Sequence, residues 1–407
     1  MAELIARETY LRRLAANKDT DVVKIITGMR RSGKSSLLLL FYDYLLAEGV
    51  APENIIIMNF ESLRFGNIEE YLSLYEFVSA KIPEKGRTYL LFDEIQQVLH
   101  WEKAVESFRL DFDVDIYITG SNARMLSSEF ATLLSGRYVE IEVLPLSFKE
   151  FLSFYSFEKS VSDEEKFMKY LRFGGMPVLR EYNFDETGCN QVLEGIYSTV
   201  LLRDIMSRYD KVDGVTLKKI ILFLCSNIGS ATSPNNIAGV LVHEKDLDSP
   251  RNFAGKTVEK YISMLNSAYL FYSVGRYDIK GRQLLKTLSK NYIADIGLRN
   301  LLLGYRDAER GHILENIVYL ELRRRGYRVY IGKAGENEID FVAEKTDEKI
   351  YFQVAESIIS PETRAREIRP LQTVRDNYEK IILSMDRSFI TSENGIKFVN
   401  IIDWLSE

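Results

Sequence analysis

Residues 22–41 decide the fold of this chain, and their sequence is Val22-Val-Lys-Ile-Ile-Thr-Gly28-Met-Arg-Arg-Ser-Gly-Lys-Ser35-Ser-Leu-Leu-Leu-Leu-Phe41. A β-branched run ends at Gly28, a glycine loop follows, and an apolar run continues after Ser36, which predicts a strand, a loop and a helix in succession. The loop has the P-loop spacing Gly-x-x-x-x-Gly-Lys-Ser. Its glycines let backbone N–H groups converge on phosphate oxygens at the positive end of the helix. The stretch therefore predicts a nucleotide site.

Each fixed position of the loop has an expected role. Lys34 is predicted to contact the β- and γ-phosphates of ATP, and Ser35 to place its hydroxyl on Mg²⁺. Arg30 and Arg31 are candidates for contacts with the phosphates or with a neighbouring subunit. The nucleotide-binding residues that we expect in this loop are Gly28, Arg30, Arg31, Ser32, Gly33, Lys34, Ser35 and Ser36.

A second apolar run, residues 89–92, ends in Asp93 and Glu94. Apolar residues are typical of a buried parallel strand, and its carboxyl end is where ligands bind in open α/β sheets. We expect Asp93 to hold Mg²⁺ through water and Glu94 to polarise the water that attacks ATP. The alternative is a solvated strand end without a ligand.

Three more strands are predicted, over residues 55–60, 114–119 and 138–144, the last at a sheet edge. Ser121 or Asn122, after the strand 114–119, stands where AAA+ proteins, which this part of the chain resembles, place the group that contacts the γ-phosphate or the attacking water. A turn without a ligand is the alternative there. Arg137 is a candidate arginine finger that would act across a subunit boundary, which predicts a homo-oligomer. A salt-bridged surface arginine is its alternative.

Four motifs together resemble a large family of prokaryotic AAA+ ATPases: Gly28-Met-Arg-Arg-Ser-Gly-Lys-Ser35, Leu90-Leu-Phe-Asp-Glu-Ile-Gln96, Thr119-Gly-Ser-Asn122 and Leu133-Leu-Ser-Gly-Arg-Tyr138. The resemblance covers nearly the whole chain, including residues 173–177, 202–204 and 338–341. It implies an α/β fold in which a P-loop AAA+ ATPase domain with a parallel sheet precedes a helical and winged-helix domain and an α/β endonuclease-like domain. We expect these domains over residues 1–155, 156–300 and 301–407.

The middle of the chain predicts helices over residues 163–210, then three helices at 216–226, after 233–234 and at 253–267, and a hairpin of 269–277 with 283–288. Three helices and a hairpin are typical of a winged helix-turn-helix. A protein-interaction module or an ATPase lid is the alternative, and DNA contact is inferred from fold analogy. The candidate phosphate contacts are Lys256, Thr257 and Lys260 on the third helix and Arg276, Lys280 and Arg282 on the wing.

The order of elements from residue 312 resembles restriction-endonuclease-like folds. Glu315, Glu338 and Asp340 match the acidic positions, but Gln353 stands where a carboxylate is expected and Ala355 where a lysine is expected. An amide binds Mg²⁺ less well than a carboxylate, and alanine cannot orient water. We therefore predict a degenerate nuclease fold, with the basic residues at 323–325 and 328 as candidates for phosphate contact.

Composition narrows the class of protein. A net charge of −6 over 407 residues argues against a protein that coats nucleic acid, and two cysteines with three histidines have no metal-ligand spacing. Without a signal peptide or an apolar membrane span, we expect a cytoplasmic protein. The leading hypothesis is an oligomeric ATPase that couples hydrolysis to DNA binding, remodelling or translocation. The alternatives are a nucleotide-switched regulatory ATPase that acts on a protein partner and an ATP-gated nuclease.

Overall fold

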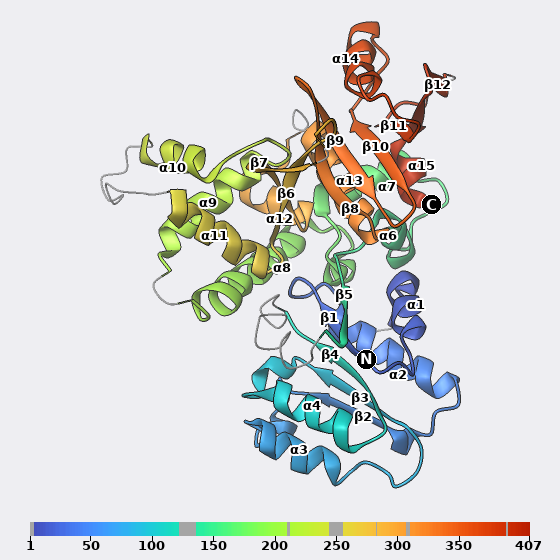
Figure 1. Cartoon of the computed structure of the whole chain (residues 1–407), viewed down its shortest axis with the longest axis vertical. Coiled ribbons are helices and arrows are strands. Elements are labelled where there is room, and N and C mark those ends of the chain that lie inside the picture. Colours follow the sequence, from blue (N-terminus) through green and yellow to red (C-terminus); the bar gives the residue numbers. More distant parts are fainter. Residues whose placement is uncertain are drawn as a thin grey trace. The chain divides into compact units, whose positions relative to one another are not determined.

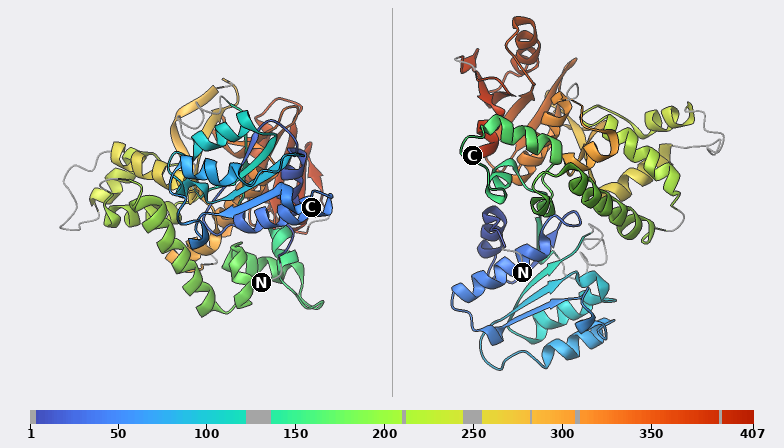
Figure 2. Two further views of the ribbon diagram at one scale, coloured as in Figure 1. Left: turned by 90° about the horizontal axis from the view of Figure 1, so that it is seen from below. Right: turned by 180° about the vertical axis from the view of Figure 1, so that it is seen from behind.

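The computed structural model describes residues 4–121, 136–209, 212–243, 255–281, 283–306, 310–387 and 390–407. The chain forms two compact units, residues 1–145 with 267–269, and residues 146–266 with 270–407. The elements of each unit can be followed in Figure 1 and, from behind, in Figure 2. The predicted α/β class is confirmed. None of the helices in the described ranges has the length and apolar character needed to cross a membrane.

The first unit is built on a five-stranded parallel sheet with the order β2-β3-β4-β1-β5. Every strand predicted for this part of the chain is present, and β5 lies at an edge as expected. The order places β4 between the strand that leads into the P-loop and the strand that ends in Asp93. The elements are α1 (Glu8–Ala16), β1 (Val23–Thr27), α2 (Lys34–Ala47), β2 (Ile55–Asn59), α3 (Tyr71–Ser79), β3 (Thr88–Asp93), α4 (Trp101–Asp111), β4 (Val114–Thr119) and β5 (Tyr138–Glu142), with short 3₁₀ turns at Pro52–Asn54, Leu63–Phe65 and Ile95–Gln97.

Both faces of this sheet are buried, because its strands are apolar at successive positions. In β3, Leu90 and Phe92 pack toward α3 and α4, whereas Tyr89 and Leu91 pack toward α1 and α2. Side chains alternate between the faces of a strand, so one continuous apolar run serves two cores. This packing fixes where the carboxyl end of each strand lies, and with it the position of the residues that follow the strand.

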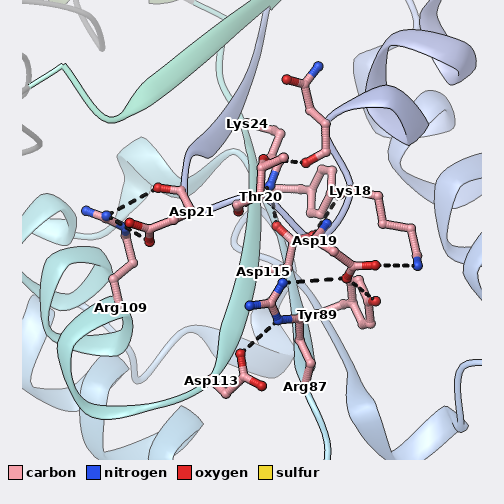
Figure 3. A network of polar contacts seen from close by, with 12 residues as sticks. Lys18, Asp19, Thr20, Asp21, Lys24, Arg87, Tyr89, Arg109, Asp113 and Asp115 are labelled. Carbon is pink, nitrogen blue, oxygen red and sulfur yellow. Dashed lines mark hydrogen bonds and ion pairs between the residues drawn. The ribbon is translucent and has the colours of Figure 1, made fainter.

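A polar network joins the segment 18–24 to β3 and β4 (Figure 3). At its centre Lys24 and Asp115 form an ion pair in which neither side chain is exposed. Asp115 also accepts hydrogen bonds from the backbone N–H of Asp19 (2.8 Å) and the hydroxyl of Tyr117 (3.1 Å). Burial lowers the pKa of Lys24, and the charge of Asp115 opposes that shift. Because an unpaired buried charge is costly, the pair fastens β1 to β4 at their amino-terminal ends.

The second unit combines helices with an eight-stranded mixed sheet of the order β12-β13-β11-β10-β9-β8-β6-β7. The predicted helices and hairpin of the middle region are present. The helices are α6 (Phe148–Phe154), α7 (Asp163–Phe173), α8 (Glu186–Thr199), α9 (Gly214–Ser226), α10 (Pro234–His243), α11 (Gly255–Ser267), α12 (Ile296–Leu303), α13 (Arg310–Arg324), α14 (Pro361–Gln372) and α15 (Ile401–Ser406), with a 3₁₀ helix at Pro177–Tyr182 and a π-helix at Val200–Met206. The strands are β6 (Phe271–Asp278), β7 (Gln283–Ile293), β8 (Arg328–Ala334), β9 (Asn337–Glu344), β10 (Lys349–Val354), β11 (Glu379–Ser384), β12 (Ser392–Glu393) and β13 (Ile396–Asn400).

The hairpin β6–β7 is part of the same sheet as the strands that follow it, because β6 pairs in parallel with β8. The predicted domain boundaries, at 155/156 and 300/301, stay predictions. α13 packs on the strands β7 to β10, and α14 packs on β9, β10 and β11.

Gly174 and Gly175, which follow α7, contact the residues at the start of α12. Asp295 caps α12 and accepts hydrogen bonds from the backbone N–H groups of Gly175 (2.7 Å) and Leu298 (3.2 Å). Gly174 has a φ of +76°, and a Cβ there would lie 2.4 Å from Oδ1 of Asp295. Glycine is therefore required at this position by both backbone conformation and close approach.

Candidate functional site

The loop between β1 and α2 has the conformation that its glycines predict. Gly28 has a φ of +128°, and a Cβ on it would lie 2.3 Å from the backbone oxygen of Val143. Gly33 has a φ of +102°, immediately before α2 begins at Lys34. Any larger residue would be strained by the positive φ at both positions, and at Gly28 its Cβ would also clash with Val143. Glycine at these positions therefore lets the backbone wrap closely around a ligand.

Lys34 lies inside this loop and is 4% exposed. Its Nζ donates to the backbone oxygens of Gly28 and Met29, at 3.0 Å each. The ammonium group is thereby held beside the backbone N–H groups of the loop. Such a site concentrates positive charge where phosphate oxygens are expected.

The P-loop and the end of β3 meet directly. Oγ of Ser35 donates to Oδ1 of Asp93 at 3.1 Å. The same Oδ1 accepts from the hydroxyl of Thr119 at 2.6 Å, and Oδ2 accepts from Nδ2 of Asn59 at 2.8 Å. Burial raises the pKa of Asp93, while the hydrogen bonds from Thr119 and Ser35 lower it. A carboxylate beside a hydroxyl is an oxygen donor set that suits Mg²⁺.

Glu94 follows in a left-handed backbone conformation, with a φ of +55°. Its backbone N–H donates to Oγ1 of Thr119 at 2.9 Å, and its carboxylate accepts a hydrogen bond from Nε2 of Gln96. The residue is 6% exposed, and burial raises its pKa, whereas the charge of Lys34 lowers it. Glu94 thus combines a strained backbone with a buried carboxylate whose basicity is enhanced, close enough to Lys34 to feel its charge.

Three residues of this site were not predicted from the sequence. Thr119 and Asn59 end β4 and β2, and both contact Asp93, as the preceding distances show. Arg7, which is 3% exposed, donates from Nη1 to the backbone oxygen of Ser32 (2.8 Å) and from Nη2 to that of Leu144 (2.9 Å). Thr119 and Asn59 could have been found from the sequence, because each is a polar residue at the carboxyl end of a strand. Nothing local in the sequence marks Arg7.

The remaining predicted residues of the first unit do not all lie at this edge of the sheet. Arg30 pairs with Glu61 at 3.4 Å, and Ser121 is buried just after β4. Ser32 is fully buried, and its Oγ has no hydrogen-bond partner among the described residues. Arg137 is exposed immediately before β5, and its backbone oxygen accepts from the N–H of Val23, so it lies at the edge of the sheet opposite the P-loop. Other predicted positions are Arg31, which has a φ of +65°, Ser36, which is exposed in the first turn of α2, and Asn122, which lies outside the described residues.

The acidic positions of the second unit converge on a lysine. Nζ of Lys290 lies 2.9 Å from Glu315, 3.0 Å from Glu338 and 3.7 Å from Asp340. The hydroxyl of Tyr292 donates to Glu315 at 2.6 Å. Burial, with the charge of Glu315, raises the pKa of Asp340 to about 8, and Lys290 opposes that shift. One internal ammonium group thus lies within ion-pair distance of all three acidic side chains.

Gln353 and Ala355 occupy the other two positions of the endonuclease-like pattern, and both make contacts within the fold. Oε1 of Gln353 accepts from the backbone N–H of Asp340 at 3.3 Å, and Ala355 is buried. In the described part of the chain, no group of three or more His, Cys, Asp or Glu side chains is arranged to hold a metal ion. The cluster around Lys290 therefore gives no support to a metal-dependent nuclease.

Only some of the residues of the second unit that are predicted to contact phosphates are exposed. Lys256 and Lys260 are exposed on α11, and Lys280 is exposed in the turn between β6 and β7. Arg276 instead lies 3.8 Å from Glu338. Thr257 is half-buried, and Arg282 lies outside the described residues.

Comparisons with known proteins agree with this geometry. Residues 20–152 match the family model of an AAA domain, and residues 164–309 match that of a domain of unknown function. An uncharacterized protein of Haemophilus influenzae is 42% identical over 99% of this chain and 98% of its own length. An uncharacterized protein of Methanocaldococcus jannaschii is 30% identical over 98% of this chain and 90% of its own length. The solved structure of a Walker-type ATPase of Pyrococcus abyssi is similar with a TM-score of 0.50 at 15% identity, covering 73% of this chain and 95% of that one. The endonuclease-like assignment of the C-terminal region finds no support in these matches.

Proposed function

We propose that this chain, which belongs to the family of AAA-domain proteins that includes its Haemophilus influenzae relative, binds ATP with Mg²⁺ and hydrolyses ATP to ADP and phosphate. The observation that carries the proposal is the meeting of Ser35 and Asp93 at 3.1 Å, beside the buried Lys34 and Glu94. These residues come from two separate segments, and each has the chemistry that phosphoryl transfer requires at that place. The unpartnered hydroxyl of Ser32 adds a buried polar atom in the same loop.

Each residue has a distinct role in the proposed reaction. The backbone N–H groups of the loop and Lys34 bind the phosphates and stabilise the charge that grows on the leaving oxygen. Ser35 and Asp93 would hold Mg²⁺, which neutralises phosphate charge when bound. Glu94 orients and polarises the attacking water as the bond between the γ-phosphorus and the bridging oxygen breaks. Thr119 positions both carboxylate-bearing residues through one hydroxyl.

Steady-state ATP hydrolysis by the purified chain tests the proposal. Lys34→Ala and Glu94→Gln should each lower kcat by roughly a hundredfold or more, because each removes a group that acts on the reacting phosphate or water. Lys85→Ala and Glu84→Gln are matched controls, since both residues are exposed in the same unit and lie outside the site. Full activity in either site variant, or an equal loss in the controls, would exclude this site as the source of hydrolysis.

We further propose that hydrolysis is coupled to DNA through the second unit, where α11 exposes Lys256 and Lys260. Single-stranded, duplex and branched DNA should each be added to the ATPase assay, with Lys256→Gln/Lys260→Gln as the test variant. Stimulation by DNA that is lost in this variant supports a DNA-coupled motor. Hydrolysis that no DNA changes would favour the alternative of a nucleotide-switched ATPase that acts on a protein.

A further inference from the structure

A pocket of about 1060 Å³ is lined by residues of the second unit alone, and none of them is among the residues proposed to act on ATP. It is formed by the turn after β6, the end of β8, the start of β10 and the segment that runs from the last turn of α14 to β11. Figure 1 shows α14 beside β10 and β11. The volume is at the upper end of what small-molecule sites usually occupy, roughly 300–1,000 Å³, so the pocket has room for an extended ligand.

The lining of this pocket is strongly basic. Its charged residues are Lys280, Lys349, Arg369, Arg375 and a single carboxylate, Asp376. Lys280, Arg369 and Arg375 are exposed, and in the described part of the chain none of their side chains has an ion-pair or hydrogen-bond partner. Three unpaired cations that converge on one cavity create a positive potential that attracts an anion.

The carboxylate in the lining is already engaged. Oδ2 of Asp376 accepts from the hydroxyl of Tyr351 at 2.6 Å, and Oδ1 lies 3.8 Å from Nζ of Lys380. Lys349 is likewise paired, with Glu344 at 2.8 Å. The charge available to a ligand is therefore that of the three unpaired cations.

Three tyrosine rings also line the pocket. Tyr277, Tyr351 and Tyr378 surround Nζ of Lys349, with ring centres 4.9, 5.6 and 5.7 Å away. Tyr351 is buried under the pocket, whereas Tyr378 is 50% exposed at its margin. An exposed ring beside a basic groove is a platform on which a nucleobase stacks. An acidic peptide would satisfy the cations but would leave this ring unused.

We propose that this pocket binds single-stranded nucleic acid, with phosphates on Lys280, Arg369 and Arg375 and a base stacked on Tyr378. The inference goes beyond ATP hydrolysis, and it deepens the proposed coupling to DNA by assigning a strand-binding site apart from α11. Binding here reads the backbone and any base, so it is expected to tolerate different sequences.

Fluorescence anisotropy of a labelled oligothymidylate with the full-length chain, at several salt concentrations, tests the proposal. Arg369→Gln/Arg375→Gln should weaken binding on the order of tenfold at 0.1 M salt and lower the slope of log K against log salt by about 1.4, since each phosphate contact to a single strand contributes about 0.7. Tyr378→Ala should weaken binding roughly tenfold, and Tyr378→Phe should not, because phenylalanine keeps the ring.

Matched controls separate this inference from the proposals on which it builds. Lys159→Gln/Lys218→Gln removes the same charge from exposed positions of the second unit outside the pocket. The basal ATPase rate of the pocket variants should equal that of the unaltered chain, so a failure of the ATPase proposal is recognised separately. Lys256→Gln/Lys260→Gln should affect duplex binding more than binding of the oligothymidylate.

Three results would overturn the proposal. One is unchanged affinity and salt slope in the arginine double variant, and another is an equal loss in the lysine control. The third is competition by a poly-glutamate peptide, or by the mononucleotide alone, that matches competition by unlabelled oligothymidylate. The peptide result would indicate a site for acidic protein segments, and the mononucleotide result would indicate a site for a free nucleotide.

Discussion

Thr119→Val should slow ATP hydrolysis strongly, although the hydroxyl of Thr119 is not proposed to contact ATP. The substitution keeps the shape of the side chain and removes its Oγ1, which donates to Asp93 at 2.6 Å and accepts from the backbone N–H of Glu94 at 2.9 Å. A hydrogen bond to a charged group contributes about 1.5–3 kcal/mol. If that energy is used to hold Asp93 and Glu94 in their reactive positions, kcat should fall roughly 10- to 150-fold.

Stability should also fall, because the N–H of Glu94 is buried and loses its acceptor. An unpartnered buried donor costs about 1–3 kcal/mol, which for a unit of this size lowers Tm by roughly 2–10 °C. The assay is kcat and KM for ATP together with a thermal melt. Thr119→Ser is the matched control, since serine keeps the hydroxyl and should retain most of the activity.

The reasoning is refuted if Thr119→Val hydrolyses ATP at the unaltered rate while its Tm drops. That result would mean that Asp93 and Glu94 do not depend on Thr119 for their positions. A loss of activity shared equally by the serine and valine variants would implicate the packing of the γ-methyl group rather than the hydrogen bonds.

Three further predictions concern other parts of the molecule. Asp115→Ala should lower the free energy of unfolding by about 3–5 kcal/mol because it leaves Lys24 charged and buried, and Lys24→Met/Asp115→Leu should recover most of that loss in urea denaturation. Burial raises the pKa of Asp295 to about 6, so the folded state favours the protonated form. The stabilising contribution of this group should therefore be present in full below about pH 4 and be lost, by about 3 kcal/mol, as pH rises from 4 to 6, and Asp295→Asn should remove that part of the pH dependence. Arg137→Ala should abolish hydrolysis alone, and mixing it with Lys34→Ala subunits should restore part of the activity if Arg137 acts across a subunit boundary.

The two tryptophans make the stability measurements specific. Trp101 lies in α4 of the first unit and Trp404 in α15 of the second. A Trp404→Phe background therefore reports unfolding around Lys24 and Asp115, and a Trp101→Phe background reports unfolding around Asp295. Unchanged stability of Asp115→Ala would contradict the first prediction. A pH dependence that survives Asp295→Asn would contradict the second, and a mixture of Arg137→Ala and Lys34→Ala subunits that stays inactive would contradict the third.

Much of the first unit was predictable because its chemistry resides in contiguous stretches. The P-loop is a single run of residues, and the apolar strand before Asp93 and Glu94 is another. Local spacing therefore predicted the residues that the structure brings together, and hydrophobic runs predicted the strands that carry them. Arg137 and Ser121 keep the roles of candidates, since their side-chain chemistry depends on a bound nucleotide or a second subunit.

The second unit shows where such reasoning reached its limit. Glu315, Glu338 and Asp340 were expected together from the order of elements, and they do converge. The residue at their centre, Lys290, comes from β7, in a hairpin that was predicted to form the wing of another domain. The pairing of β6 with β8 places that hairpin in the same sheet, and no local pattern specifies such a pairing.

The sequence by itself determined the α/β class, the five strands of the first unit, the glycine loop with Lys34 and Ser35, and the carboxylates of Asp93 and Glu94. Only the tertiary structure decided that β4 lies between β1 and β3, which places Thr119 against Asp93 and Glu94. It also decided that Arg7 holds the P-loop, that Lys290 pairs with the acidic cluster and that four distant segments line one basic pocket. The physical reason is that periodicity and turn chemistry act within about ten residues, whereas strand order and the partners of buried charges are set by packing between segments far apart in the chain.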